Sequence, residues 1–241
     1  MAKQTWKGST LLNPEPPVLV SCGSMEAANL ITIGWTGTIC TQPSMVSISV
    51  RPERYSYQLI KDSGEFVINL PTRKLVRAVD WCGVKSGRDY DKFAEMKLTP
   101  LPASTVSCPI LAESPVNLEC QVTQVIPLGS HDMFLAEVLG VTVDEKYMDV
   151  NGKFHLNDAG LVAYSHGEYF ELGEKLGKFG YSVAKKQAAK PESVTKSAKP
   201  SGAGKKAASA ENRTASKTGA GNRRKSASKT GSADKQKSRR K

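Results

Sequence analysis

The chain has 241 residues, and its 34 Lys and Arg against 23 Asp and Glu give a formal net charge of +11 at pH 7. That length allows one domain of ordinary size or two small ones. There is no apolar run of the ~18–20 residues that a membrane-spanning helix needs, and the N-terminus lacks the pattern of a secretory signal, so we expect a cytoplasmic protein.

The first half of the body alternates strands with two short helices. Four runs rich in β-branched residues predict strands: Val18–Cys22, Asn29–Ile39, Met45–Arg51 and Glu65–Leu70. Residues Arg54–Gly64 predict a two-turn helix with a hydroxyl at its start and a terminating glycine. A second helix is expected to begin at Thr72, which would cap it, and to end at Gly83.

The second half of the body is dominated by a predicted hairpin. Val116–Ile126 and Met133–Glu145 are its strands, and Leu128–Asp132 is the turn. Asp91–Met96 predicts a helical turn before it, Gly160–His166 predicts a final strand, and Tyr169–Tyr181 closes the body. About seven strands with short helices indicate a mainly β fold, a small closed or partly closed barrel.

Two neighbouring strands each show a row of small polar residues. Alternation places Thr32, Gly34, Thr36 and Thr38 on one face of the first, and Ser47, Ser49 and Arg51 on one face of the second. Hydroxyls and glycine ending in arginine suit a flat polar ligand with an anionic end. Arg51, Arg54 and Ser56, beside a helix N-terminus, predict a phosphate seat. The competing interpretation is a threonine-rich edge strand with stray arginines.

Several other chemistries lack their motifs. HExxH, GxSxG and DxDxDG are absent, and three scattered histidines give no metal-ligand spacing. The five cysteines are widely spaced without a CxxC pair, which is typical of reduced thiols rather than of a disulfide frame or a zinc site.

Four segments in order carry a resemblance to a known family. They are Asn29-x-x-Thr32-x-x-Trp35, SISVRPERYSY (47–57), GEFVINLP (64–71) and SGRDYDKF (86–93). Over roughly residues 12–182 the chain resembles the flavin reductase-like family, in its flavoredoxin and ferric-reductase-like branch. The resemblance implies an FMN-binding split β-barrel that forms a homodimer and holds FMN near the subunit interface.

The resemblance also implies site residues. Those expected at the cofactor are Thr32, Trp35, Ile48, Ser49, Val50, Arg51, Tyr55, Ser56, Ser86, Gly87 and Lys92. Those expected to shape the face where the second substrate docks are Asn29, Trp35, Ser56, Lys92, His131 and Tyr164. Cys40 matches a cysteine near the flavin in some relatives, but its neighbour is Ile39 rather than a second cysteine, and no metal site is assigned.

Each of these residues has a plainer interpretation. Trp35 fits a core position on the apolar face, and His131 fits a solvated turn. Lys92 would ordinarily be a surface lysine and Cys40 a small buried hydrophobe.

The expected activity is an NAD(P)H-dependent reductase that takes hydride onto FMN and passes electrons to flavin, iron or a protein acceptor. Hydride arrival needs no general acid or base, in keeping with the missing His/Asp/Glu constellation. One alternative is the flavin-supplying partner of a two-component monooxygenase. The other is a flavin- or haem-binding module or electron carrier without turnover, tethered to nucleic acid by its basic tail.

A basic tail follows the body. Residues 1–184 hold 16 basic and 20 acidic residues, whereas 185–241 hold 18 basic and 3 acidic ones, a net charge of +15. The tail contains no aromatic residue, so we expect it to be disordered and to bind nucleic acid weakly, without sequence choice. A solubilising appendage and an anchor to anionic membrane or an acidic protein are the alternatives.

Overall fold

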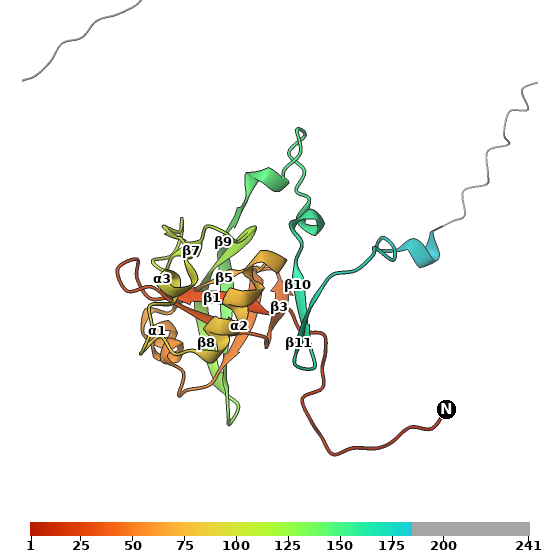
Figure 1. The fold of residues 1–241 in the computed structure, drawn as a ribbon, viewed down its shortest axis with the longest axis horizontal. Coiled ribbons are helices and arrows are strands. Elements are labelled where there is room, and N and C mark those ends of the chain that lie inside the picture. Colours follow the sequence, from red (N-terminus) through yellow and green to blue (C-terminus); the bar gives the residue numbers. More distant parts are fainter. Residues whose placement is uncertain (185–241) are drawn as a thin grey trace, which may run out of the picture. The chain divides into compact units, whose positions relative to one another are not determined.

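The structure is a computed structural model that describes residues 1–184. Its central element is a seven-stranded antiparallel sheet (Figure 1). Its strands are β1 (Val18–Cys22), β2 (Asn29–Ile33), β3 (Thr36–Thr41), β4 (Ser44–Val50), β5 (Glu65–Asn69), β8 (Val116–Pro127) and β9 (Asp132–Val143). They lie in the order β2-β1-β5-β8-β9-β4-β3. The two ends of this order, β2 and β3, are consecutive in the chain, so the sheet curls into a partly closed barrel. The mainly β prediction is confirmed.

Short elements decorate the sheet. The helices are α1 (Tyr55–Ser63), α2 (Val76–Val84) and α3 (Lys92–Met96), with 3-10 turns η1 (Arg73–Leu75), η2 (Glu145–Tyr147), η3 (Leu156–Ala159) and η4 (Tyr181–Val183). Two small hairpins pair β6 (Pro100–Leu101) with β7 (Ile110–Leu111) and β10 (Val162–Ser165) with β11 (Glu168–Glu171). Within residues 1–184 no helix is long and apolar enough to cross a membrane. The predicted disorder and nucleic-acid binding concern 185–241, outside the described residues.

The sheet buries apolar side chains on both of its faces near β1. Inside the curl, Val20, Ile48, Phe66 and Phe134 pack with Ile60 of α1. Outside it, a second cluster packs Leu19 and Leu30 against α2 and α3. Every residue of β1 is therefore buried, which explains its continuous apolar sequence. This second layer holds α2 against β2, where the candidate site lies.

Several predicted elements are confirmed closely. Val18–Cys22 forms β1 with the predicted bounds, and β8 and β9 form the long hairpin across the turn before Asp132. Helix α1 ends at Gly64, whose φ of 69° is left-handed and whose N–H donates to the carbonyl of Ile60.

Two predicted helix caps are wrong. Arg54 occupies the N-cap of α1 without a side-chain bond, and Ser56 is already inside the helix, with its hydroxyl turned to Asn29. Thr72 stands at the N-cap of η1 but its side chain makes no capping hydrogen bond. In both places a tertiary contact or burial competes with the local capping interaction.

The predicted strand Asn29–Ile39 is wrong in its continuity, because the chain bends at Gly34–Trp35 and a bulge follows between Thr38 and Cys40. Ile31 is buried, but Trp35, which fits a core position by alternation, is 41% exposed. Beyond the bend, Thr36 and Thr38 stand opposite Ile48 and Val46 of β4 in the register. The two polar rows therefore do not form one continuous shelf.

Candidate functional site

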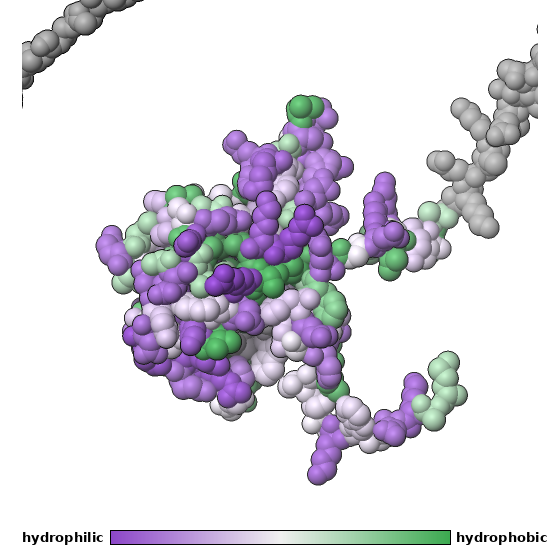
Figure 2. All heavy atoms as spheres, in the orientation of Figure 1, coloured by the Kyte–Doolittle hydropathy of each residue, from purple (hydrophilic) through white to green (hydrophobic). Residues whose placement is uncertain are grey.

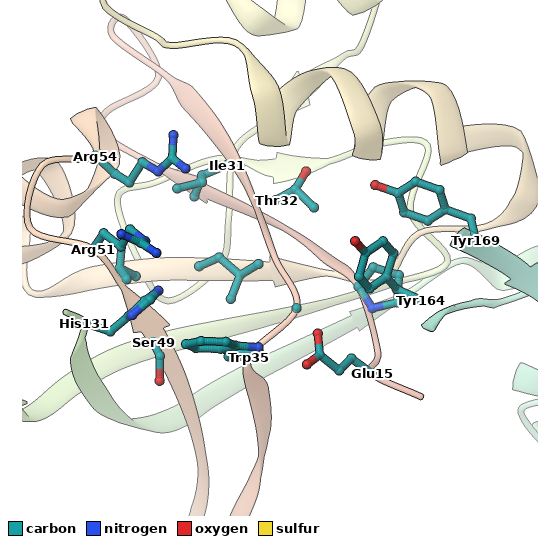
Figure 3. A pocket seen from close by; sticks show the side chains of 14 residues that line it. Glu15, Ile31, Thr32, Trp35, Ser49, Arg51, Arg54, His131, Tyr164 and Tyr169 are labelled. Carbon is teal, nitrogen blue, oxygen red and sulfur yellow. The ribbon is translucent and has the colours of Figure 1, made fainter. Parts of the chain in front are cut away.

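A cavity of about 250 Å³ opens where β2, the bend at Gly34–Trp35 and the end of β4 meet (Figure 3). Two segments far away in the chain, before β1 and in the β10–β11 hairpin, complete it. We call it the main cavity. Its lining consists of Glu15, Pro17, Ile31, Thr32, Ile33, Gly34, Trp35, Ser49, Val50, Arg51, Arg54, His131, Tyr164 and Tyr169.

Charge is distributed unequally along the main cavity. Figure 3 shows Arg51, Arg54 and His131 on one side and Glu15 on the other, beside two tyrosines. Burial lowers the pKa of His131, and the positive charge of Arg51 lowers it further, so the imidazole is neutral at pH 7. The positive charge of this end therefore comes from the two arginines, of which Arg51 also faces Glu53 at 3.5 Å between Nη1 and Oε1.

Trp35 forms a flat wall of the main cavity. Its ring centroid lies 4.5 Å from that of His131, with the planes tilted by 44°. Its backbone carbonyl accepts a hydrogen bond of 2.9 Å from the N–H of Ser49, which fixes the bend against β4. The indole is thus held by the backbone on one side and by the imidazole on the other, and presents an aromatic face to the cavity.

Thr32 contributes an oriented hydroxyl. Its Oγ1 donates to the carbonyl of Val79 in α2 at 2.5 Å, so its proton is committed to the helix. A Cβ at Gly83 would lie 3.3 Å from the Cβ of Thr32, which shows how closely α2 packs on β2. Thr32 can therefore offer a lone pair, but no proton, to a ligand in the main cavity.

The opposite wall joins the two ends of the body. Glu15 and Tyr164 exchange backbone hydrogen bonds of 2.8 and 2.9 Å. The ring of Tyr164 packs 5.1 Å from that of Tyr169, whose hydroxyl donates to Asp80 Oδ1 at 3.4 Å. Burial and the neighbouring Asp80 raise the pKa of Tyr169 to about 12, which keeps this phenol protonated.

A second cavity of about 120 Å³ adjoins the main one, because Ile31 and Arg54 line both. It lies between the start of α1 and the loop after α2, and we call it the basic cavity. Its lining is Ile31, Glu53, Arg54, Tyr55, Ser56, Cys82, Gly83, Lys85, Ser86, Gly87, Arg88 and Lys92. Four cations among these residues, against one carboxylate, make it a site for an anion. The first turn of α1 contains no acidic residue, so its N–H groups add to this preference.

Lys92 is not a surface lysine. It is 3% exposed, and its Nζ donates to the carbonyl of Cys82 at 2.7 Å. Burial lowers the pKa of Lys92, while the thiols of Cys82 and Cys22 oppose this shift. The ammonium uses one of its donors on the carbonyl, and the remaining N–H bonds are available at the cavity wall.

Asn29 supports the basic cavity from behind. It is 4% exposed, and its Nδ2 donates to the Oγ of Ser56 at 2.7 Å. A Cβ at Gly87 would lie 2.1 Å from Asn29 Oδ1 and 2.7 Å from Tyr55 Cδ1, so only glycine lets the loop approach so closely. Asn29 lines neither cavity, and its side chain positions Ser56, which lines the basic cavity.

Most of the predicted site residues converge. The main cavity contains Thr32, Trp35, Ser49, Val50, Arg51, His131 and Tyr164, and the basic cavity contains Tyr55, Ser56, Ser86, Gly87 and Lys92. Ile48 lines neither, because its side chain is fully buried in the core with Phe134. Cys40 also lies apart, half-buried beyond the bulge of β3, where it lines a different cavity on the sheet.

Sequence reasoning missed Glu15, Tyr169, Lys85 and Arg88. Glu15 lies in a proline-rich segment, and Tyr169 was assigned to the closing segment of the body. No spacing in the sequence links either residue to β2. Lys85 and Arg88 flank the predicted loop residues Ser86 and Gly87, so the alternation of basic with small residues was an available signal.

Comparison with known proteins places this geometry in context. Residues 11–173 match the family model of the flavin reductase like domain. An uncharacterised protein of Pyrococcus abyssi (strain GE5 / Orsay) is 31% identical over 170 residues, which cover 70% of this chain and 97% of that protein. An NADPH-flavin oxidoreductase of Streptomyces viridifaciens is 27% identical over 135 residues, 55% of this chain and 69% of that protein.

A solved structure shows the same fold. The flavoredoxin of Desulfovibrio vulgaris (Miyazaki F) superposes with a TM-score of 0.70 and 32% identity. The superposition covers 76% of this chain and 100% of the flavoredoxin chain. The predicted split barrel is confirmed.

Proposed function

The chain belongs to the flavin reductase-like family, and from that premise we propose that it binds FMN across the two adjoining cavities and reduces it with NAD(P)H. The observation that carries the proposal is the continuity of an aromatic-walled cavity with a basic one through Arg54. FMN likewise combines a flat aromatic ring with a chain that ends in an anionic phosphate.

The donor set fits the phosphate of FMN. Arg54, Lys85 and Arg88 surround the basic cavity, and the start of α1 adds backbone N–H groups and the hydroxyl of Ser56. Guanidinium groups bind phosphate oxygens in pairs, and a helix N-terminus favours negative charge. Arg88 is already oriented, because its Nη1 donates to the backbone carbonyl of Glu53 at 3.2 Å.

The main cavity fits the ring. Trp35 offers an aromatic face, Ile31 an apolar surface and Thr32 an acceptor, and the absence of a side chain at Gly34 leaves the bend open. The arginines lie at one end of the lining and the carboxylate of Glu15 at the other. A ring with a phosphate chain should therefore enter with the phosphate toward the arginines. With a ring bound, this wall would shield one side of the reacting atoms from water, which favours hydride transfer.

When bound, FMN would accept a hydride from NAD(P)H, leaving NAD(P)⁺, and pass the two electrons on to an acceptor. The residues of this chain need to supply no proton for hydride transfer from the nicotinamide to the flavin ring. Lys92 holds a charge-assisted hydrogen-bond donor near the cavity wall. The neutral His131 adds no positive charge to that of the arginines. The site therefore positions, desolvates and balances charge.

We also propose a homodimer. The outer surface at β3 and β9 exposes Ile39, Leu139 and Val141, at 46%, 42% and 57%, beside a cavity of about 460 Å³. The residue colouring of Figure 2 shows hydrophobic side chains on the surface of the folded unit among mainly hydrophilic ones. An exposed apolar surface of this kind commonly marks an interface, and association of two copies of the chain would bury it.

The experiment is a titration of purified full-length protein with FMN, followed by anaerobic mixing with NADH or NADPH. Quenching of flavin fluorescence at micromolar FMN, then bleaching of the flavin absorption band, is expected. Turnover of added free FMN identifies a flavin reductase, whereas a single bleaching event identifies a carrier. Protein that fails to quench FMN contradicts the proposal.

A second function is proposed for residues 185–241, which carry a net charge of +15. The match to the family model covers residues 11–173, so the basic segment lies outside the matched domain. We propose that it binds nucleic acid through counterion release. Retention of the full chain, but not of residues 1–184, on DNA at low salt is expected. Equal retention of the two would contradict it.

A further inference from the structure

Glu15 places a carboxylate at the end of the main cavity remote from the arginines (Figure 3). A Cβ built on Gly34 would lie 2.5 Å from its Oε2, so the carboxylate reaches over the bend at Gly34. The half-buried side chain forms no hydrogen bond or ion pair with any residue in the described part of the chain. A carboxylate that no protein group engages has free acceptor sites for a ligand that enters the cavity and donates a hydrogen bond there.

The backbone, not the side chain, fixes Glu15 in place. Its N–H and carbonyl are both paired with Tyr164, at 2.8 and 2.9 Å. The N–H of His166 donates to Asn13 Oδ1 at 3.2 Å and anchors the same segment. A change at the side chain of Glu15 therefore leaves the wall of the cavity standing, which makes the position suitable for substitution.

The polarity of the cavity then decides which end of a ring can face Glu15. This step rests on the proposed function, which puts the phosphate at Arg54 and the ring in the main cavity. The flavin ring has an apolar dimethylbenzene end and a pyrimidine end, and the pyrimidine end carries the N3–H donor. An apolar end would leave the carboxylate unsatisfied, whereas the N3–H would pair with it.

We propose that Glu15 accepts a hydrogen bond from the flavin N3–H and so sets the orientation of the ring in the main cavity. The same negative charge opposes the charge that the ring gains on reduction. Glu15 therefore weakens binding of reduced FMN relative to oxidised FMN, which lowers the reduction potential of the bound flavin. The residue acts as a specificity-determining and potential-setting group, with no part in proton transfer.

The first test compares binding of FMN and 3-methyl-FMN, in which a methyl group replaces the N3 hydrogen. Wild-type protein is expected to bind 3-methyl-FMN roughly tenfold more weakly, as for loss of one hydrogen bond to a charged group. Glu15→Ala should reduce this ratio to about one, within the spread expected for a lost hydrogen-bond partner. The control Glu26→Gln changes an exposed carboxylate that lines neither cavity and should keep the wild-type ratio.

The second test is the midpoint potential of bound FMN in wild-type protein and in Glu15→Gln, which keeps the shape and removes the charge. We expect tighter binding of reduced over oxidised flavin by about tenfold, a rise of about 30 mV for two electrons. The control variant should leave the potential unchanged.

The outcomes separate this inference from the proposed function. Equal binding of FMN and 3-methyl-FMN by wild-type protein overturns the role of Glu15 and leaves FMN binding intact. A wild-type preference for FMN that persists in Glu15→Ala, or an unchanged potential in Glu15→Gln, overturns it as well. Failure to bind FMN at all overturns the proposed function instead.

Discussion

Replacement of Arg54 by alanine should weaken FMN binding more than any other single loss of a cation at the site. Its side chain lines both cavities, whereas Arg51 lines one and already faces the carboxylate of Glu53. A charge-assisted hydrogen bond is worth about 1.5–3 kcal/mol, and the exposure of Arg54 reduces this to about 1–2 kcal/mol. At 1.4 kcal/mol for each factor of ten, the dissociation constant should rise roughly five- to thirtyfold.

The assay is quenching of flavin fluorescence by full-length protein at low and at high salt. The difference between wild type and Arg54→Ala should narrow at high salt, since part of the attraction is screened. Arg77→Ala is the matched control, because Arg77 is exposed on α2 and lines neither cavity. The helix remains capped as before, since Arg54 makes no side-chain capping bond. Equal affinities of Arg54→Ala and Arg77→Ala would refute the placement of the phosphate.

Three further substitutions test the frame around the site. Burial raises the pKa of the Cys120 thiol from 9.0 to about 12. The folded state therefore keeps the thiol protonated where the unfolded state ionises it, so the free energy of unfolding is unaffected below pH 9 and falls as pH rises toward 12. Cys120→Ala should flatten this fall by up to about 1.4 kcal/mol per pH unit in denaturant titrations. Glu119, 1% exposed, accepts two backbone N–H bonds, so urea denaturation of Glu119→Gln at pH 7 should show a loss of roughly 1–3 kcal/mol, and an unchanged midpoint would contradict this. Gly87→Ala puts a methyl group 2.1 Å from Asn29 Oδ1 and should lower both the melting temperature and FMN affinity, whereas Gly37→Ala, with nothing within 4 Å, should leave FMN affinity at the wild-type value.

Local sequence predicted the elements whose signals are local. Helix α1 is bounded by Gly64, which adopts a left-handed φ that glycine accommodates without strain. The β8–β9 hairpin followed from two long alternating runs around a turn. The resemblance predicts that the loop after α2 lies at the cofactor, and in the structure this loop lines the basic cavity, with Gly87 packed closely on Asn29.

Tertiary structure decided what the sequence could not. Alternation through Gly34–Trp35 predicted one strand, but the bend turns Trp35 from the core to the cavity. Ser56 was predicted to cap a helix because it lies near the helix start, yet its hydroxyl oxygen accepts a hydrogen bond from Asn29 Nδ2 of β2. A contact between residues this far apart leaves no periodic trace in the sequence, so pattern analysis cannot recover it.

The division of charge in the main cavity depends on the closure of the body by its two ends. The arginines come from the short segment between β4 and α1, which is positioned by local structure. Glu15 reaches the cavity only because the segment before β1 pairs with Tyr164 of the β10–β11 hairpin. Loss of that pairing would remove the acidic end and leave the basic end intact. On the proposed function, phosphate binding and ring orientation depend on separate parts of the fold, so we expect substitutions to alter one without the other.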